Sequence, residues 1–431
     1  MMNTAKNWNL FTWWTVVFIA LMPFYVLIKV FFEYKLWVPF FGFFIKELLI
    51  VALVILAAIE FIRKKIKPKL DILDILVLSY FAYWIAITLV NGLWISHIVH
   101  GWRYDFFFLG ILLIYKHSAE FLQVSAEKLI KYFLISASAS IFLWFLVKFV
   151  FGEDRLIFFG FTDYGAYSTT QAAVPTHHWL ERSGIKRFQW ILEWPNAMWY
   201  FLIVYTTLIL HIQKNKFQFH NVLFTILMFW LVILTYSRSA LLGIWVAWVS
   251  LFLLNIKYIY YRVRKYILPI VAWCIIFFGI LWVVFQEKLF YAVVRPWSTA
   301  GHMERMEIWV DRFLEKPFGS WLATSGPAFR SVHEGDISVE DEAYYIPESW
   351  FIQQLTEWGF IYFSLFILIL LNILWRLYKD SKVLMVWFIA ILVMNIFLHI
   401  FESTHLTYSL FLILWVMFAK HNGKYFVHQR K

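Results

Sequence analysis

An arginine stands between two apolar runs in the segment LTYSRSALLGIW, at position 238. Its polar neighbours in sequence are Tyr236, Ser237 and Ser239. An arginine at the edge of an apolar run costs free energy in a membrane unless it is paired or reaches water. Two interpretations of Arg238 follow. It marks a turn and extends its guanidinium to the membrane interface, or it holds a phosphate through two parallel hydrogen bonds.

A second arginine, Arg305, lies in the polar stretch 286–348, which is the longest interruption between apolar runs. Residues 302–316 have helical periodicity, and Pro317 and Gly319 would end such a helix. The residues of its expected apolar face are Met306, Trp309, Val310 and Phe313. We therefore expect an amphipathic helix that lies over one end of the protein, with Arg305 near its start. A long loop of this kind is usually functional.

The composition defines the class of protein to which these residues belong. The 431 residues are 62% hydrophobic and only 15% charged, whereas soluble domains carry about 25% charged residues. The chain is therefore expected to be an integral membrane protein that forms a single membrane domain, 1–431. The net charge of +11 is explained by lysines and arginines in cytoplasmic loops, so we expect no nucleic-acid partner. Cys274 is the single cysteine, which excludes an intrachain disulfide.

Apolar runs near 20 residues long predict an all-α fold with about twelve transmembrane helices. The predicted spans are 10–31, 38–61, 72–90, 104–115, 129–151, 195–212, 221–235, 239–255, 266–285, 350–374, 383–400 and 406–419. With this count the most basic connecting segments all fall on one side, which places both termini in the cytoplasm. The loops 152–194 and 286–348 then lie on the outer face.

Four segments in the second half of the chain resemble the O-antigen ligase and O-antigen polymerase superfamily. They are TYSRSALLG, the loop arginine in MERMEIW, the Pro-x-Gly turn in KPFGSW, and ESWFIQQLTEWGFIYF with its Glu-x-Gly element at Glu357 to Gly359. A further likeness is the Pro-Asn pair at Pro195 and Asn196 that precedes a span. The resemblance covers residues 185–370, and the first five spans share only the general character.

The resemblance implies a membrane-embedded glycosyltransferase of the C type with a long outer loop. Such enzymes move a glycan from an undecaprenyl-diphosphate carrier to an acceptor glycan or glycolipid at the outer face of the bacterial plasma membrane. They need no metal and no cofactor. Arg238 stands at the family's Ser-Arg position and Arg305 at its loop arginine, so the resemblance assigns both to the departing diphosphate.

One departure concerns the residue before the span that follows the loop. The ligases usually have a histidine there, where this chain has Glu348. A carboxylate with a suitable pKa can accept the proton of the acceptor hydroxyl, and His333 is an alternative base. The departure leaves polymerase and ligase both open.

Other polar groups are candidates for substrate binding, namely Arg103, Arg187, Tyr236, Ser237 and His333. Arginines at the outer ends of spans more often contact lipid headgroups, so that alternative stands for Arg103 and Arg187. The pairs His97/His100 and His177/His178 lack nearby carboxylate or cysteine ligands, and we expect no metal site.

The rival function is a transporter or flippase for a lipid-linked glycan. Transporters carry charges near the middle of the membrane and often have broken helices. Lys46 and Glu47 are the main charges inside the predicted spans, and no internal repeat is visible. The sequence therefore favours the enzyme over the transporter.

Overall fold

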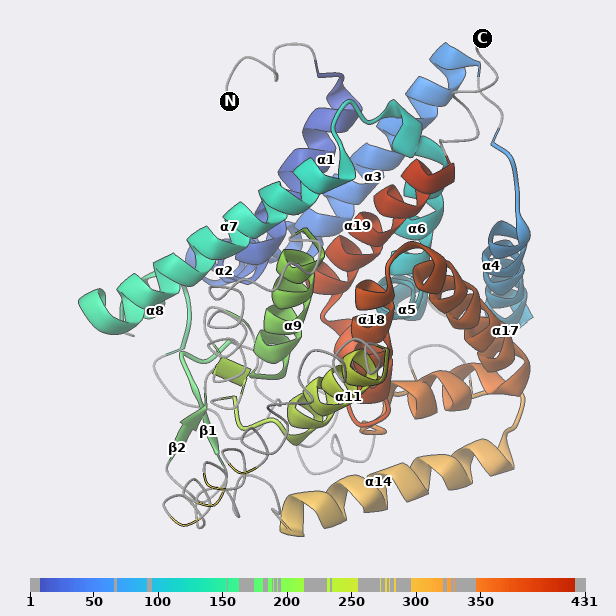
Figure 1. Cartoon of the computed structure of the whole chain (residues 1–431). Coiled ribbons are helices and arrows are strands. Elements are labelled where there is room, and N and C mark those ends of the chain that lie inside the picture. Colours follow the sequence, from blue (N-terminus) through green and yellow to red (C-terminus); the bar gives the residue numbers. More distant parts are fainter. Residues whose placement is uncertain are drawn as a thin grey trace.

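The computed structural model describes 8–65, 68–90, 95–152, 154–162, 174–180, 185–187, 189, 192, 195–212, 231–232, 235–254, 296–320, 324–326, 329 and 346–422, with single positions at 272, 276, 279 and 283. These residues are mostly helical (Figure 1). The helices are α1 (Leu10–Leu21), α2 (Tyr25–Val30), α3 (Pro39–Lys64), α4 (Ile72–Val90), α5 (Ile95–Asp105), α6 (Phe107–Ser118), α7 (Ala126–Leu146), α8 (Arg155–Phe158), α9 (Pro195–Ile212), α11 (Arg238–Leu254), α14 (Pro296–Glu315), α17 (Trp350–Asp380), α18 (Lys382–Asn395) and α19 (Thr404–Asn422). Strands β1 (His178–Leu180) and β2 (Ile185–Arg187) form one antiparallel pair.

Helix starts are fixed by polar side chains that accept a backbone N–H of the first turn. Asn9 accepts from Thr12 at the start of α1, at 2.8 Å. Ser349 and Ser381 do the same at the starts of α17 and α18. Each cap follows a polar stretch and precedes an apolar run, so the sequence itself sets these boundaries.

Four helical stretches among the described residues are long and apolar enough to cross a membrane: Leu10–Lys35, Ile72–Val90, Ala126–Phe151 and Trp350–Asp380. A fifth span results if Ile98–Asp105 and Phe107–Phe121, which meet at 60°, count as one. The described part of the chain is therefore mostly helical, with four or five helices that could cross a membrane. The span predicted at 72–90 coincides with α4, which is one of these four. The span predicted at 195–212 coincides with α9, a shorter apolar helix that is not among them. Those predicted at 221–235 and 266–285 lie mostly outside the described residues.

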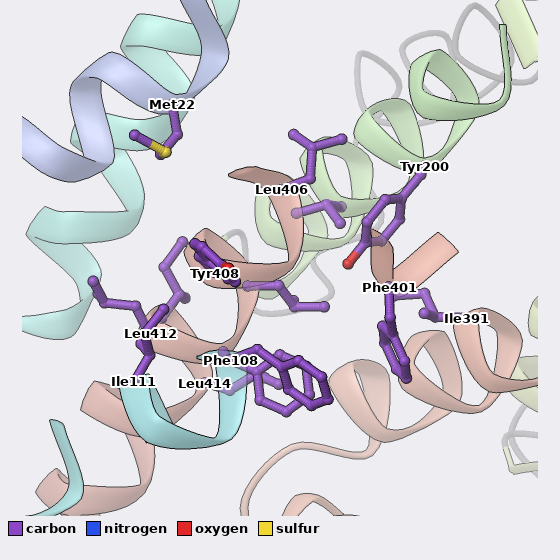
Figure 2. Packing of buried hydrophobic residues seen from close by; sticks show 14 of the residues in the cluster. Met22, Phe108, Ile111, Tyr200, Ile391, Phe401, Leu406, Tyr408, Leu412 and Leu414 are labelled. Atoms are coloured by element: carbon purple, nitrogen blue, oxygen red, sulfur yellow. The ribbon is translucent and has the colours of Figure 1, made fainter. Parts of the chain in front are cut away.

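The core of the bundle gathers around α19, which packs against α6, α7 and α9. Figure 2 shows Phe108 of α6, Tyr200 of α9, Ile391 of α18 and Tyr408 of α19 among the side chains of this core. All four side chains are almost fully buried. Phe108 and Phe411 are 4.8 Å apart between ring centroids, in a tilted arrangement that aromatic pairs favour. Helices from both halves of the chain thus share one core.

One end of the bundle is held together by an ion-pair network, and we call it the basic end. Lys116 at the end of α6 contacts Asp71 and Asp74 at the start of α4. Arg376 near the end of α17 binds Asp71 at 2.9 Å. Because three helix ends meet through these pairs, the segments near 71, 116 and 376 lie on the same side of the protein. The start of α17 lies at the opposite end.

The amphipathic helix expected at 302–316 is present as α14, which begins earlier, at Pro296. Its buried face differs from the expected one. Trp309 is 2% exposed, whereas Val310 is 40% exposed. The shift arises because α14 packs on α17 along a single line of contact, where the Trp309 carbonyl accepts a hydrogen bond from Thr356 at 3.3 Å. Most of the other apolar side chains of the helix remain partly or fully exposed.

Candidate functional site

Glu348 lies directly before α17, where Ser349 caps the helix. Its backbone is in the left-handed region, with φ of 51°, which costs a residue with a side chain about 1–2 kcal/mol. Its carboxylate is 15% exposed and is held by two partners. We call the end of the bundle that carries Glu348 the site end.

Both partners of Glu348 come from α14. His302 Nδ1 donates to Glu348 Oε2 at 2.7 Å, and Arg305 Nη2 contacts Glu348 Oε1. His302 and Arg305 are three residues apart, so one face of the helix presents both. Burial alone would raise the pKa of Glu348. The hydrogen bond from His302, with the charges of His302, Arg305 and His399, outweighs burial and lowers that pKa below its usual value.

The Pro-x-Gly and Glu-x-Gly elements interlock. Gly359 has φ of 76° and interrupts α17, and the residues after α14 fill the break. Phe360 N donates to the Pro317 carbonyl at 3.0 Å, and Ser320 N donates to the Thr356 carbonyl at 2.8 Å. The backbone groups freed by the break in α17 are therefore satisfied by the loop. This contact fixes the C-terminal end of α14 on α17.

Glu357 of the same element is fully buried and holds a further part of the loop. Its Oε1 accepts from Ser325 N at 2.9 Å and from Ser325 Oγ at 3.0 Å. The loop thus contacts the first turns of α17 at three places, through Trp309, Gly319 and Ser325. The loop that carries Arg305 is thus built onto the helix that follows Glu348.

Arg187 joins the Pro-Asn pair to the turn before Arg238. Its Nε donates to the Thr235 carbonyl at 2.9 Å, and its Nη2 donates to Asn196 Oδ1 at 3.4 Å. Tyr236 in this turn has φ of 51°, and the hydroxyls of Ser237 and Ser239 are 3.1 Å apart. Arg187 therefore supports the turn from which α11 begins.

Arg238 is half-buried at the start of α11, and α11 packs on α18. Gly243, just over one turn later, lies against Met394 near the end of α18. The Asn395 carbonyl next to it accepts from Ser349 Oγ at 3.5 Å. Arg238 therefore lies at the site end, as Glu348 does. Three catalytic groups were predicted: Arg238, Arg305 and Glu348. Among the described residues, Arg305 and Glu348 are the two of them that are in direct contact.

Arg103, expected at a span entrance, is buried and 5% exposed. Its Nε contacts Glu47 Oε1 at 2.8 Å, and Lys46 contacts the same oxygen at 3.0 Å. Tyr25 accepts a hydrogen bond from Lys46 at 2.9 Å. The two charges predicted inside a span are thus part of a buried cluster with Arg103. A role of Arg103 in substrate binding stays a prediction.

His302 is the residue of this site that the sequence analysis did not single out. Its position one turn before Arg305, on a helix expected to cover the site, was the available signal. The predicted alternative base, His333, lies outside the described residues. Within the described part of the chain, no group of three or more His, Cys, Asp or Glu side chains is arranged to hold a metal ion.

Comparison with models of protein families gives no match, and comparison with curated proteins gives none either.

Proposed function

We propose that this protein transfers a glycan from an undecaprenyl-diphosphate carrier to an acceptor sugar at the outer face of the bacterial plasma membrane. The proposal includes the C-type glycosyltransferase fold, about twelve spans and cytoplasmic termini. One observation supports it most directly: the contact between Arg305 and Glu348 at the site end. It places a permanent cation and a carboxylate together, outside the apolar spans and next to the imidazole of His302.

The charges suit the chemistry of this transfer. Diphosphate departure from an anomeric carbon places negative charge on phosphate oxygens, which a fixed guanidinium stabilises. Arg305 Nε is buried and makes no hydrogen bond among the described residues, so this donor is available to an anion. Arg238 at the same end would supply a second guanidinium. One base suffices for the acceptor hydroxyl, because diphosphate leaves without protonation, unlike the leaving groups of glycoside hydrolysis.

The test uses purified protein with the undecaprenyl-diphosphate-linked oligosaccharide of its own source. Carrier release and product length are followed for wild type, Arg238→Ala and Arg305→Ala. We expect each variant to lose at least about 100-fold in rate. The matched control is Arg312→Ala, because Arg312 lies on α14 two turns after Arg305 and its guanidinium is 4.4 Å from the ring centroid of Trp309. A ladder of products means a polymerase, and a single transfer means a ligase. Absence of carrier release with every acceptor would refute the enzyme.

A second candidate, transport of a lipid-linked glycan, is favoured by one finding. Two interrupted helices meet inside the protein: the bent pair α5 and α6, and α17 with its break at Gly359. Phe106 at the first break is 5.1 Å from Trp358 beside the second, and Gln354 donates to Asp105 at 2.6 Å. Broken helices that meet near buried carboxylates are a feature of transporters. Movement of a labelled carrier across proteoliposomes without chemical change would support this function instead.

A further inference from the structure

The contacts of Glu348 bear on which group takes the proton during the proposed transfer, and this inference rests on that proposed function. Both carboxylate oxygens are engaged, Oε1 by Arg305 and Oε2 by His302. An anion held by two donors is a weak base, because accepting a proton would cost it those interactions. The lowered pKa of Glu348 agrees with this. Glu348 therefore suits the role of a fixed anion better than that of a proton acceptor.

His302 has the opposite properties. An ionised carboxylate only accepts hydrogen bonds, so the imidazole must carry its hydrogen on Nδ1, the atom that faces Glu348. In the neutral ring the lone pair is then on Nε2. Among the residues that the structure describes, no hydrogen bond uses His302 Nε2, and the side chain is 33% exposed. A carboxylate that holds Nδ1 in this way orients an imidazole base and stabilises the imidazolium that forms.

We propose that His302 Nε2 accepts the proton of the acceptor hydroxyl and that Glu348 is the positioning residue that orients the ring. In this step the acceptor oxygen forms a bond to the anomeric carbon as the bond from that carbon to the diphosphate oxygen breaks. The electron pair of the broken bond stays on the diphosphate. The hydroxyl proton moves to Nε2, and the imidazolium later releases it to water. Arg305, one turn away on α14, offers its unpaired Nε–H to the departing diphosphate.

The proposal also accounts for the departure from the family pattern. Where the resembling ligases have a histidine before the span, this chain has Glu348, and its imidazole comes from α14 instead. The charged groups that face this pair are Arg305 on α14 and His399 from the segment between α18 and α19.

The decisive variant is His302→Asn, whose side-chain amide can still donate to Glu348 but has no basic nitrogen. We expect its rate of carrier release to fall by about 100-fold or more, with melting in detergent within about 2 °C of wild type. In His302→Ala, added imidazole should restore part of the rate. The matched control is Met303→Ala, since the adjacent Met303 is 60% exposed; its rate should equal that of wild type.

Variants of Glu348 separate positioning from proton transfer. Glu348→Gln removes the anion that orients the ring and stabilises the imidazolium, so its maximum rate should drop. Glu348→Asp keeps a carboxylate and should retain part of that rate. A His302→Asn protein that keeps its rate, while Glu348→Gln loses it, would overturn the proposal and make Glu348 the base. Failure of wild type to release carrier would instead refute the proposed function itself.

Discussion

Gly319 and Gly359 lie backbone against backbone at the break in α17. A Cβ added to Gly319 would stand 2.9 Å from the Gly359 nitrogen and 2.5 Å from the Glu357 carbonyl oxygen. A Cβ added to Gly359 would stand 2.3 Å from the Phe318 carbonyl carbon. Both residues also have positive φ, of 103° and 76°. The close approach of the loop to α17 therefore depends on glycine at both positions.

Gly319→Ala and Gly359→Ala should each destabilise the protein by about 3 kcal/mol or more, because strain and backbone overlap add. Melting in detergent should fall by at least about 5 °C. Gly110→Ala is the matched control, since a Cβ there meets nothing within 4 Å. An unchanged melting temperature in both variants would show that the interlock is absent in solution.

Arg187→Ala should loosen the turn that precedes α11, because it removes the donors to the Thr235 carbonyl and to Asn196. Hydrogen bonds to a charged group contribute about 1.5–3 kcal/mol. Hydrogen exchange at residues 235–240 should accelerate, and the rate of glycan transfer should fall if the turn positions Arg238. Arg187→Lys should exchange as fast as Arg187→Ala, because an ammonium cannot reproduce the two hydrogen bonds that the planar guanidinium donates.

The contribution of the basic end to folding stability should depend on pH through Asp71. Burial alone would raise the pKa of Asp71, but hydrogen bonds and charges from Lys116 and Arg376 outweigh it and lower that pKa to about 2. A carboxyl with a lowered folded-state pKa contributes stability above its unfolded pKa of about 3.9, and loses it as pH falls toward 2.

Asp71→Asn should therefore melt a few degrees below wild type at pH 6, with the difference shrinking between about pH 4 and pH 2. The side chain is 37% exposed, so solvent screening limits its contribution to about 1 kcal/mol. Glu304→Gln, at an exposed position of α14, controls for loss of a carboxylate alone. A difference that stays constant with pH would contradict the assigned pairing.

Glu47→Gln should be strongly destabilising. It leaves Lys46 and Arg103, which are 1% and 5% exposed, without the carboxylate that both contact. Removing one partner of a buried ion pair costs about 3–5 kcal/mol. Low yield and early melting are expected, and the double variant Lys46→Met with Glu47→Gln should recover part of the loss. Wild-type stability of Glu47→Gln alone would contradict a buried cluster.

Local signals predicted much of the fold. Continuous apolar runs between polar stretches located α4 and α9 to the residue, and helical periodicity located most of α14. The breaks at Phe106 and Gly359 were not predicted, although the charged residues Asp105 and Glu357 lie close before them in sequence. Each lies against distant partners: Phe106 packs on Trp358, and the break at Gly359 is hydrogen-bonded by the segment 317–320. A short stretch of sequence does not show which distant residues will pack against it.

The candidate site was also predicted only in part. The family-like pattern identified Arg305 and Glu348 as candidates, and they are in contact. It did not identify His302, because the likeness directs attention to the residue before the span. The expected apolar face of α14 was partly wrong, since periodicity fixes a face but not what packs against it. Arg103 appeared to be a surface residue because its partner Glu47 is distant in sequence.

The left-handed backbone at Glu348 has a consequence for selection. Glycine adopts φ of 51° without the cost that any side chain incurs there. The partly exposed ion pairs of Glu348 offset about 1 kcal/mol at most, a gain comparable to that cost. Glutamate therefore makes the folded protein no more stable than glycine would at position 348. Directed evolution for heat tolerance would accept glycine here and lose transfer, as expected where a functional residue occupies a strained conformation.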